Sequence, residues 1–360
     1  MTARPAAAHL LVTGGAGFIG SAFVREVLAR HDGTRITVLD KLTYAGNETN
    51  LEPVRDDPEQ AERLTFVRGD IADPEAVAPL AAVADAIVNF AAESHVDRSI
   101  LDPEAFLRTG VIGVHVLLEA QRREAARAAS GKRASAPRLL HVSTDEVYGS
   151  VDEGHAPESA TLAPRSPYAA AKAAGELLAR SYVITYGADV VVTRGSNTYG
   201  PYQHPEKLIP LFVTNALDDG ELPLYGDGLQ RRDWLEVTDH ALAIEHVLWH
   251  GVAGETYNIP GSAELTNRDV VARLLEHLGK PWSLVRTVED RPGHDRRYAM
   301  DGTKLAALGW RNRIPFEVGL ARTIDWFAAN EPWWRAVRSG DWDAYYERMY
   351  GARLATSREA

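Results

Sequence analysis

Apolar runs alternate with amphipathic stretches along roughly the first half of the chain. The runs are short and mostly apolar, as in "HLLVT", "RITVLD", "LTFVRGDI", "DAIVNFAA", "APRLLHVST" and "DVVVTRGSNTYG". Strands of this kind are buried on both faces, because helices cover both sides of a parallel sheet. The pattern predicts an α/β fold built on a doubly wound, Rossmann-type parallel sheet.

The pattern changes after residue 196, where prolines, glycines and aromatic residues interrupt shorter elements. This change predicts a smaller, mostly C-terminal α/β domain. Within it, "PLYGDGLQRRDWLEVTDHALAIEHVLWH" is expected to return to the main sheet as a strand and a helix. The Trp-rich tail is expected to be helical, with its aromatic side chains in a core. The predicted division is 1–196 with 234–258 for the first domain, and 197–233 with 259–360 for the second.

Composition narrows the class of protein. The chain has 360 residues, of which 45% are apolar and 25% charged, as in ordinary globular proteins. It has no cysteine, so disulfides, thiolate metal sites and cysteine nucleophiles are excluded. A net charge of −11 argues against a nucleic-acid binder, which usually has a basic face. The N-terminal residues make a poor signal peptide and no apolar run could span a membrane, so a cytoplasmic protein is expected.

A glycine turn lies between the first predicted strand and helix. Gly15, Gly17 and Gly20 fit G-x-G-x-x-G, and Gly14, Gly17 and Gly20 fit the related T-G-x-x-G-x-x-G spacing. Such glycines let the backbone approach a pyrophosphate at the helix N-terminus. Asp40 ends the next strand, where it can accept from ribose hydroxyls and repel a 2′-phosphate. NAD is therefore favoured over NADP, the alternative being a glycine turn without a ligand.

Two further residues are expected at the part of the NAD site that binds the adenosine. Lys41 follows Asp40 directly, and Asp70 ends the third strand, where it is placed to meet the adenine.

Tyr168 and Lys172 lie one helical turn apart in "SPYAAAKAAGELL". A tyrosine hydroxyl with its ordinary pKa near 10 is a poor base at neutral pH. A neighbouring ammonium, helped by a positive nicotinamide ring, is expected to lower that pKa. The pair can then take a proton from an alcohol as hydride leaves for NAD.

Two adjacent carboxyl groups follow a buried strand in "RLLHVSTDEVYGS". Ser143 and Glu146 fit a capping box, so a purely structural role is one interpretation. Dehydrogenation itself needs Tyr168, Lys172 and a hydroxyl such as that of Thr144, but no pair of acids. Close carboxyl groups raise the pKa of one partner, which would provide an acid and a base together.

These motifs resemble the extended short-chain dehydrogenase/reductases. The motifs "VLDKLTYAGN", "NFAAESHVDRSI", "VSTDEVYG", "GPYQHPEKLIP", "RDWLEVTDHA", "YNIPG" and "DRPGHDRRYAMD" are similar to those of the dTDP-glucose 4,6-dehydratases, from about residue 9 to residue 330. The resemblance implies a hydro-lyase that turns dTDP-glucose into dTDP-4-keto-6-deoxyglucose with tightly bound NAD. It also implies a cytoplasmic homodimer, joined through helices at 104–128 and 168–186.

The resemblance also implies roles for individual residues. Glu146 would take the C5 proton, Asp145 would protonate the leaving C6 oxygen, and Thr144 would bind the 4-hydroxyl beside Tyr168. The implied cofactor-binding residues are Gly14, Gly17, Phe18, Ile19, Gly20, Asp40, Lys41, Thr43, Asp70, Ile71, Ala91, Ala92, Thr109, Tyr168, Lys172 and Thr198. The implied substrate-binding residues are Ser94, Thr144, Asn197, Lys207, Leu208, Pro223, Tyr225, Arg232, Asn267, Arg291 and His294.

Arg232 and Arg291 are the implied clamps on the substrate pyrophosphate, since guanidinium pairs well with phosphate oxygens. Without the resemblance, a solvated surface is the favoured interpretation of the basic clusters around them. No metal is expected, because His294 has no second ligand at a suitable spacing. The chain departs from the family pattern at Gly110, His115 and Thr198, near the cofactor in relatives.

Other functions share part of this pattern. A UDP-sugar 4,6-dehydratase would use the same chemistry on another nucleotide. A nucleotide-sugar 4-epimerase or decarboxylase would keep the glycine turn, Tyr168 and Lys172, but would not need the Asp145–Glu146 pair. An NAD-sensing regulator on this fold would need neither.

Overall fold

The main sheet of the computed structural model has seven parallel strands within the described residues, which are 8–290, 293–339 and 342–359. In spatial order they are β10 (Thr256–Ile259), β6 (Val190–Gly195), β5 (Arg138–Thr144), β4 (Ala86–Asn89), β1 (His9–Thr13), β2 (Arg35–Asp40) and β3 (Leu64–Arg68). The order reverses between β1 and β4. In doubly wound sheets, ligands bind beyond the carboxyl ends of the strands at this reversal.

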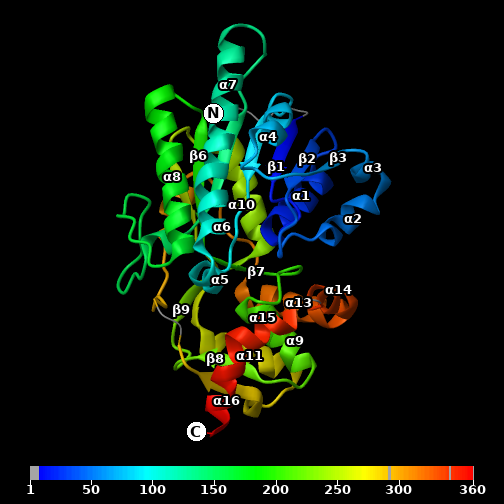
Figure 1. Cartoon of the computed structure of the whole chain (residues 1–360), viewed down its shortest axis with the longest axis vertical. Helices are drawn as coiled ribbons and strands as arrows, with labels where there is room; N and C mark the ends of the chain where they lie inside the picture. Colours follow the sequence, from blue (N-terminus) through cyan, green and yellow to red (C-terminus); the bar gives the residue numbers. More distant parts are fainter. Residues whose placement is uncertain (1–7, 291–292, 340–341, 360) are drawn as a thin grey trace.

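Helices cover both faces of this sheet (Figure 1). On one face, α1 (Phe18–Arg30) and α10 (Val237–His250) pack on alternate strand residues such as Leu10 and Val12. On the other face, α7 (Val114–Ala129) and α8 (Pro167–Tyr186) pack with Leu11 of the same strand. Each fully buried Leu or Val stabilises the fold by roughly 1.5–3 kcal/mol. Burial on both faces explains the nearly continuous apolar runs, and the doubly wound fold class is confirmed.

A smaller α/β region lies beyond the carboxyl ends of the main sheet, in the lower part of Figure 1. It holds a three-stranded sheet in the order β11 (Ala263–Thr266), β9 (Arg231–Glu236) and β7 (Asn197–Tyr199), and a two-stranded sheet of β12 (Val285–Val288) and β8 (Leu222–Tyr225). Its core includes Trp334 and Trp342, which are 1% and 4% exposed. The helical, core-forming role expected for the Trp-rich tail is confirmed.

The other elements of the chain are short connections and helices, several of which contribute side chains to the core of the smaller region. Their bounds are η1 (Glu48–Leu51), α2 (Glu52–Arg55), α3 (Pro58–Ala61), α4 (Pro74–Ala81), α5 (Val96–Leu101), α6 (Pro103–Leu107), η2 (Arg108–Gly113), η3 (Asp145–Tyr148), α9 (Leu208–Leu217), α11 (Asn267–Leu278), η4 (Trp282–Leu284), α12 (Thr303–Ala307), α13 (Phe316–Ala329), α14 (Glu331–Val337), α15 (Trp342–Tyr346), η5 (Glu347–Gly351) and α16 (Ala352–Glu359). Within the described part of the chain, no helix has both the length and the apolar character needed to cross a bilayer.

Two segments lie differently from the expectation. The strand at 231–236 belongs to the small sheet, and the strand that joins the main sheet is β10, which pairs with β6. Leu305 and Trp310, expected in the second domain, pack into the main core instead. Apolar pattern predicts that a segment is buried but not which sheet it joins. The division into two domains stays a prediction.

Candidate active site

The glycine turn between β1 and α1 leaves room for a ligand at the helix N-terminus. Gly14 has a φ of +70°, and a Cβ there would lie 2.5 Å from the backbone nitrogen of Ala91. A Cβ on Gly20 would overlap the carbonyl oxygen of Gly14. Gly17 caps α1 without a side chain that could bond its first amides. These amides therefore suit an anionic group such as a pyrophosphate.

Asp40 lies at the end of β2 and faces the same turn. Its Oδ2 accepts from the amide of Ala16 at 2.9 Å and its Oδ1 from the amide of Leu42 at 2.8 Å. Burial raises its pKa, although these two amide hydrogen bonds oppose the shift. A carboxylate has about four acceptor positions. Asp40 therefore braces the turn and keeps acceptor capacity for ribose hydroxyls.

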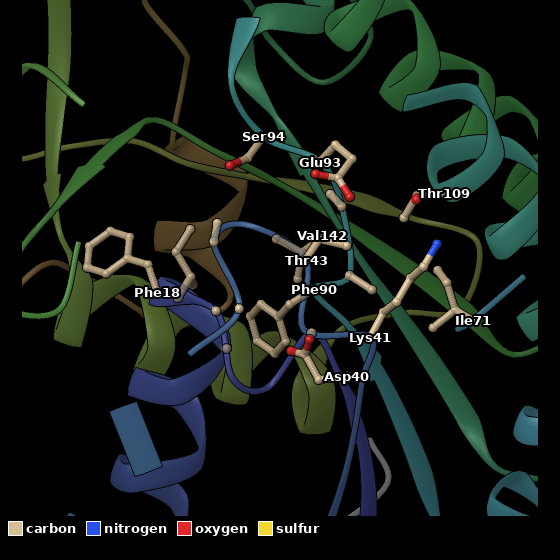
Figure 2. Close-up of a pocket in the computed structure, with 18 of the residues that line it drawn as sticks. Phe18, Asp40, Lys41, Thr43, Ile71, Phe90, Glu93, Ser94, Thr109 and Val142 are labelled. Carbon is tan, nitrogen blue, oxygen red and sulfur yellow. The ribbon is translucent and has the colours of Figure 1, made fainter. Parts of the chain in front are cut away.

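A cleft opens above the turn between the carboxyl ends of β1 and β4. Figure 2 shows Phe18 at one end of it, Asp40 near the turn, and Lys41 with Thr109 at the other end. The cleft is lined by Gly14, Gly17, Phe18, Ile19, Gly20, Asp40, Lys41, Thr43, Asp70, Ile71, Ala91, Ala92, Thr109, Tyr168 and Lys172, among others. The crowded glycine turn, the uncapped helix and the acidic end of β2 fit NAD.

Thr198, Gly110 and His115, which were singled out in the sequence, lie outside this cleft. The Thr198 hydroxyl on β7 bonds to the carbonyl of Ser196 at 3.0 Å and to Nδ1 of His240 at 2.8 Å. A Cβ on Gly110 would lie 3.1 Å from that of Ala171 on α8, so Gly110 permits close helix packing. His115 bonds through Nδ1 to the Tyr182 hydroxyl at 3.1 Å. None of the three lines the described cleft.

Asp70 and Lys41 form an ion pair of 3.0 Å between Oδ2 and Nζ at the edge of the cleft. The other oxygen of Asp70 accepts from the amide of Ala72. The pair gives this end of the cleft a local charge balance within an acidic protein.

The strand β5 ends at Thr144, and the short helix η3 then carries Asp145 and Glu146. The cap of η3 is Thr144, whose hydroxyl accepts from the amide of Glu146 at 3.3 Å. The expectation that Ser143 caps this turn is therefore wrong. The reason is that β5 continues through Ser143, whose buried hydroxyl has no hydrogen-bond partner among the described residues and lines the cleft.

The environment of Asp145 favours its protonated form. Asp145 is 3% exposed, its Oδ1 accepts from the Thr144 hydroxyl at 3.2 Å, and its Oδ2 has no hydrogen-bond partner in the described part of the chain. Burial raises the pKa of Asp145 well above its usual range, the charge of Glu146 raises it further, and Arg232 opposes the rise. The two adjacent carboxyl groups thus differ in environment: Asp145 is buried and Glu146 is half-buried.

Lys172 reaches from α8 to the neighbouring strand, where its Nζ donates to the carbonyl of Val142 at 2.5 Å. Burial lowers the pKa of Lys172 to about 8, and Glu176 opposes this shift.

Tyr168 shares a hydrogen bond with the Thr144 hydroxyl, so the two groups meet as expected. However, burial and then Glu146 raise the pKa of Tyr168, while the bond to Thr144 opposes them. The expectation that Lys172 lowers this pKa is wrong for the protein's own groups. The physical reason is that the ammonium of Lys172 is directed at a carbonyl, whereas a carboxylate acts on the phenol.

The residues expected to hold the substrate fall into two groups. Ser94 lines the cleft and accepts through its carbonyl from Nζ of Lys207 at 2.7 Å. Thr144 ends β5 of the main sheet, and the others lie on the smaller region: Asn197 begins β7, Leu208 begins α9, Pro223 and Tyr225 are on β8, Arg232 is on β9, Asn267 begins α11, and His294 precedes α12. Arg291 lies outside the described residues.

Arg232 is 4% exposed, and its positive charge opposes the rise in the pKa of Asp145 that burial causes. It donates through Nη2 to the carbonyl of Asp295 at 2.9 Å, and its guanidinium covers the ring of Tyr298 at 4.3 Å. This environment excludes the solvated-surface interpretation for Arg232.

Tyr225, one of the implied substrate-binding residues, is held by two neighbouring side chains. Its hydroxyl donates to Oδ2 of Asp97 at 3.3 Å, and the ring of His294 meets its ring edge-on at 6.0 Å. His294 is itself bonded to Asp290 at 2.6 Å. No group of three or more His, Asp or Glu placed to hold a metal occurs within residues 8–290, 293–339 and 342–359.

Four polar residues of the cleft were not expected from the sequence: Glu93, Gln203, His204 and Glu206. Glu206 is bound by Arg98 at 2.9 Å, and despite its burial the nearby His95, His204, Lys207 and Arg98 lower its pKa to about 2. The signal for Gln203, His204 and Glu206 lay in "GPYQHPEKLIP", where only Lys207 and Leu208 were assigned a role, and that for Glu93 lay in "NFAAESHVDRSI".

Comparison with known proteins identifies the family. Residues 11–323 match the family model described as GDP-mannose 4,6 dehydratase. A dTDP-glucose 4,6-dehydratase of Streptomyces niveus is 52% identical, over 92% of this chain and 96% of its own. The chain belongs to the dTDP-glucose 4,6-dehydratase family, within the extended short-chain dehydrogenase/reductases.

Solved structures agree with this assignment. The dTDP-glucose 4,6-dehydratase DesIV of Streptomyces venezuelae, solved with NAD and a second ligand bound, superposes with a TM-score of 0.85. It is 53% identical, and the match covers 91% of this chain and 99% of that one. A UDP-glucose 4-epimerase of Thermus thermophilus, solved with NAD, is 33% identical with a TM-score of 0.79, over 89% and 99% of the two chains. Because both enzymes share the fold, the chemistry must be argued from the site.

Proposed function

We propose that this protein is an NAD-dependent hydro-lyase that converts dTDP-glucose to dTDP-4-keto-6-deoxyglucose. The observation that carries the proposal is the turn after β5, where a buried Asp145 with a raised pKa stands next to the half-buried Glu146. Oxidation of a sugar hydroxyl needs no such pair, but removal of water across C5 and C6 needs both an acid and a base. The named relatives support the same substrate.

The first step is the oxidation at C4. In this proposal Thr144 holds the 4-hydroxyl and Tyr168 takes its proton, with Lys172 one helical turn away as the charged partner. Bound NAD supplies the hydride acceptor for C4 and later the hydride donor for C6, so that no net oxidation occurs. The positive charge of the nicotinamide ring also opposes the raised pKa of Tyr168.

The second step is the elimination. The new C4 ketone acidifies the hydrogen on C5, and Glu146 takes that proton. Burial raises the pKa of Asp145 and so favours its protonated form, and Asp145 gives its proton to the C6 oxygen, which leaves as water. The proton is then returned to C5 as C6 is reduced.

The proposed substrate grip uses the residues expected from the family resemblance. Arg232 and Arg291 would bind the pyrophosphate, and Tyr225, Asn267 and His294 would contact the nucleotide. Lys207 would act near the sugar, since it already bonds to Ser94 at the edge of the cleft. Thr198 would not contact NAD directly, because its hydroxyl is taken by Ser196 and His240.

The products of one incubation test the proposal against the alternatives. Purified protein is incubated with dTDP-glucose without added cofactor, and the product is identified by NMR. A 4-keto-6-deoxy sugar supports the proposal. Recovery of dTDP-galactose would favour an epimerase, and no turnover would favour a binding protein. Parallel incubations with UDP-glucose and GDP-glucose measure the nucleotide preference.

We also propose a homodimer, formed through the helices at 104–128 and 168–186. Large apolar side chains are exposed along this part of the chain, including Leu107, Ile112, Leu177 and Ile184, the last of which is 72% exposed. Isolated exposed apolar residues are common, but several on neighbouring helices favour a buried contact. A cytoplasmic location is proposed from the cysteine-free composition.

A further inference from the structure

A buried ion pair joins β6 to the helix that carries Tyr168 and Lys172. Arg194 on β6 and Glu176 on α8 are each 5% exposed. Arg194 Nε donates to the two oxygens of Glu176 at 3.1 and 3.0 Å, and Nη2 donates to Oε2 at 2.5 Å. Glu176 lies one helical turn after Lys172 on the same helix. The guanidinium is therefore fixed relative to α8.

The remaining arm of this guanidinium reaches the turn that carries the two carboxyl groups. Nη1 of Arg194 donates to the hydroxyl of Tyr148 at 2.5 Å, and the guanidinium lies 4.7 Å from the centre of the tyrosine ring. The same hydroxyl donates to Oδ1 of Asn258 on β10 at 2.8 Å. Tyr148 is the last residue of η3, the four-residue helix that begins with Asp145 and Glu146.

The groups proposed for the two chemical steps are thus held by different parts of the structure. Thr144 is the last residue of β5 and is held by pairing with Gly195 of β6, while Tyr168 and Lys172 are held by α8. Asp145 and Glu146 are not in the sheet. They sit on η3, whose far end is fixed by Tyr148 and then turns at Gly149, with a φ of +72°.

We propose that Arg194, braced by Glu176, acts through the Tyr148 hydroxyl to position Asp145 and Glu146 for the elimination step. Tyr148, Arg194 and Glu176 are positioning residues and do not touch the sugar. The inference rests on the proposed function, because it assigns the network to one step of that reaction. It predicts that loosening the network slows the elimination and leaves the C4 oxidation intact.

Tyr148→Phe is the sharpest test, because it removes one hydroxyl and leaves the Arg194–Glu176 ion pair in place. Removing a partner of a buried ion pair would instead leave an unpaired charge and endanger the fold. The matched control is Tyr199→Phe. Tyr199 is fully buried on β7, and its hydroxyl donates to the carbonyl of Phe316 at 3.2 Å, in the smaller region.

The measurement is a single turnover of dTDP-glucose by the NAD-loaded enzyme, followed through the absorbance of the reduced cofactor. In Tyr148→Phe the reduced cofactor should form at the wild-type rate and decay about tenfold more slowly, the order of loss expected when reacting groups are slightly misplaced. Tyr199→Phe should follow the wild-type course. Arg194→Lys keeps the charge but loses the planar fork, so it should accumulate reduced cofactor as Tyr148→Phe does.

Two results overturn this inference. The first is wild-type kinetics in Tyr148→Phe. The second is a slowing of both formation and decay of the reduced cofactor that is as large in Tyr199→Phe as in Tyr148→Phe. Either result leaves the proposed function standing if the wild-type enzyme eliminates water. If the wild type forms no 4-keto-6-deoxy product, the proposed function itself fails. Arg194→Lys can lose folded protein, which thermal unfolding reports, and Tyr148→Phe then decides alone.

Discussion

Lys172 and Val142 are joined by a hydrogen bond of 2.5 Å between the lysine Nζ and the strand carbonyl. The bond anchors the buried lysine two residues before Thr144, and burial lowers the pKa of Lys172 to about 8. The pKa of Lys172 is thus only slightly above neutral pH, so the ammonium form is lost when the pH rises a little. Its titration becomes visible in the activity if the reaction needs the ammonium.

We expect kcat to fall as the pH rises through about 8, because the ammonium of Lys172 is present below its pKa and lost above it. The check is a kcat–pH profile from neutral to alkaline pH, with folding followed by circular dichroism. Glu176→Gln should move the fall to lower pH, because Glu176 raises the pKa of Lys172. The variant also leaves Arg194 without its ion-pair partner, so thermal unfolding must first show that it folds. A flat alkaline profile in the wild type would exclude this role for Lys172.

Asp145→Asn should separate the two chemical steps. An amide cannot donate the proton that the C6 oxygen needs, so the elimination should slow by about 100-fold or more, while oxidation at C4 continues. Reduced cofactor should then accumulate after mixing with dTDP-glucose. Glu146→Gln should give the same accumulation, since the C5 proton has no acceptor. Loss of reduced-cofactor formation in both variants would move these residues to the first step.

The same Asp145→Asn variant should also be more stable than the wild type at neutral pH. The folded protein raises the pKa of Asp145 above its unfolded value, so folding takes up a proton and stability falls as the pH rises from the unfolded pKa toward the folded one. An asparagine avoids that cost. We expect a Tm increase of about 2 °C at neutral pH, shrinking toward zero near pH ~4, the unfolded pKa of aspartate. An equal or lower Tm at neutral pH would contradict the raised pKa.

Asp40→Ala should reduce the NAD content of the purified protein. The substitution removes both the proposed ribose acceptor and the brace to the Ala16 and Leu42 amides. Arg35→Ala is the matched control, because Arg35 is exposed at the start of the same strand and does not line the cleft. Extraction and quantification of bound nucleotide checks the prediction. Equal losses in both variants would mean that Asp40 has no special role.

Leu177→Arg should weaken the proposed dimer. Leu177 is 56% exposed on α8, and a charge there would be costly to bury in a contact between two copies. Val318→Arg is the control, since Val318 is 41% exposed on α13, which belongs to the smaller region. Sedimentation velocity should show a shift toward monomer for Leu177→Arg alone. A wild-type protein that is already monomeric would end this proposal.

Much of the fold could be predicted from the sequence, because burial on both faces leaves a clear apolar pattern. The glycine turn, Asp40 and the Tyr168–Lys172 spacing are also local features, and all of them line one cleft beyond the carboxyl ends of the main sheet. The place of β9 could not be predicted in this way. Its sequence, RRDWLE, has Trp234 and Leu235 as its two apolar residues, and its pairing with β7 and β11 decides which sheet it joins.

The electrostatics of the site were less predictable, because they depend on which way side chains turn. Spacing places Lys172 beside Tyr168, but it does not show that the ammonium points to the carbonyl of Val142. A capping motif predicts a bonded turn, yet the cap is Thr144 because β5 runs one residue further than Ser143. The link from Arg194 to Tyr148 joins residues 46 positions apart, beyond any local pattern.

The fate of one hydrogen tests the central claim most directly. dTDP-glucose carrying deuterium at C4 is mixed with unlabelled dTDP-glucose that is marked by carbon-13 elsewhere in the sugar, and the products are examined by NMR and mass spectrometry. The proposed reaction predicts deuterium at C6 of the 4-keto-6-deoxy product, in the same molecules that carried it at C4. Deuterium retained at C4, lost to water, or found in the carbon-13 product would contradict it.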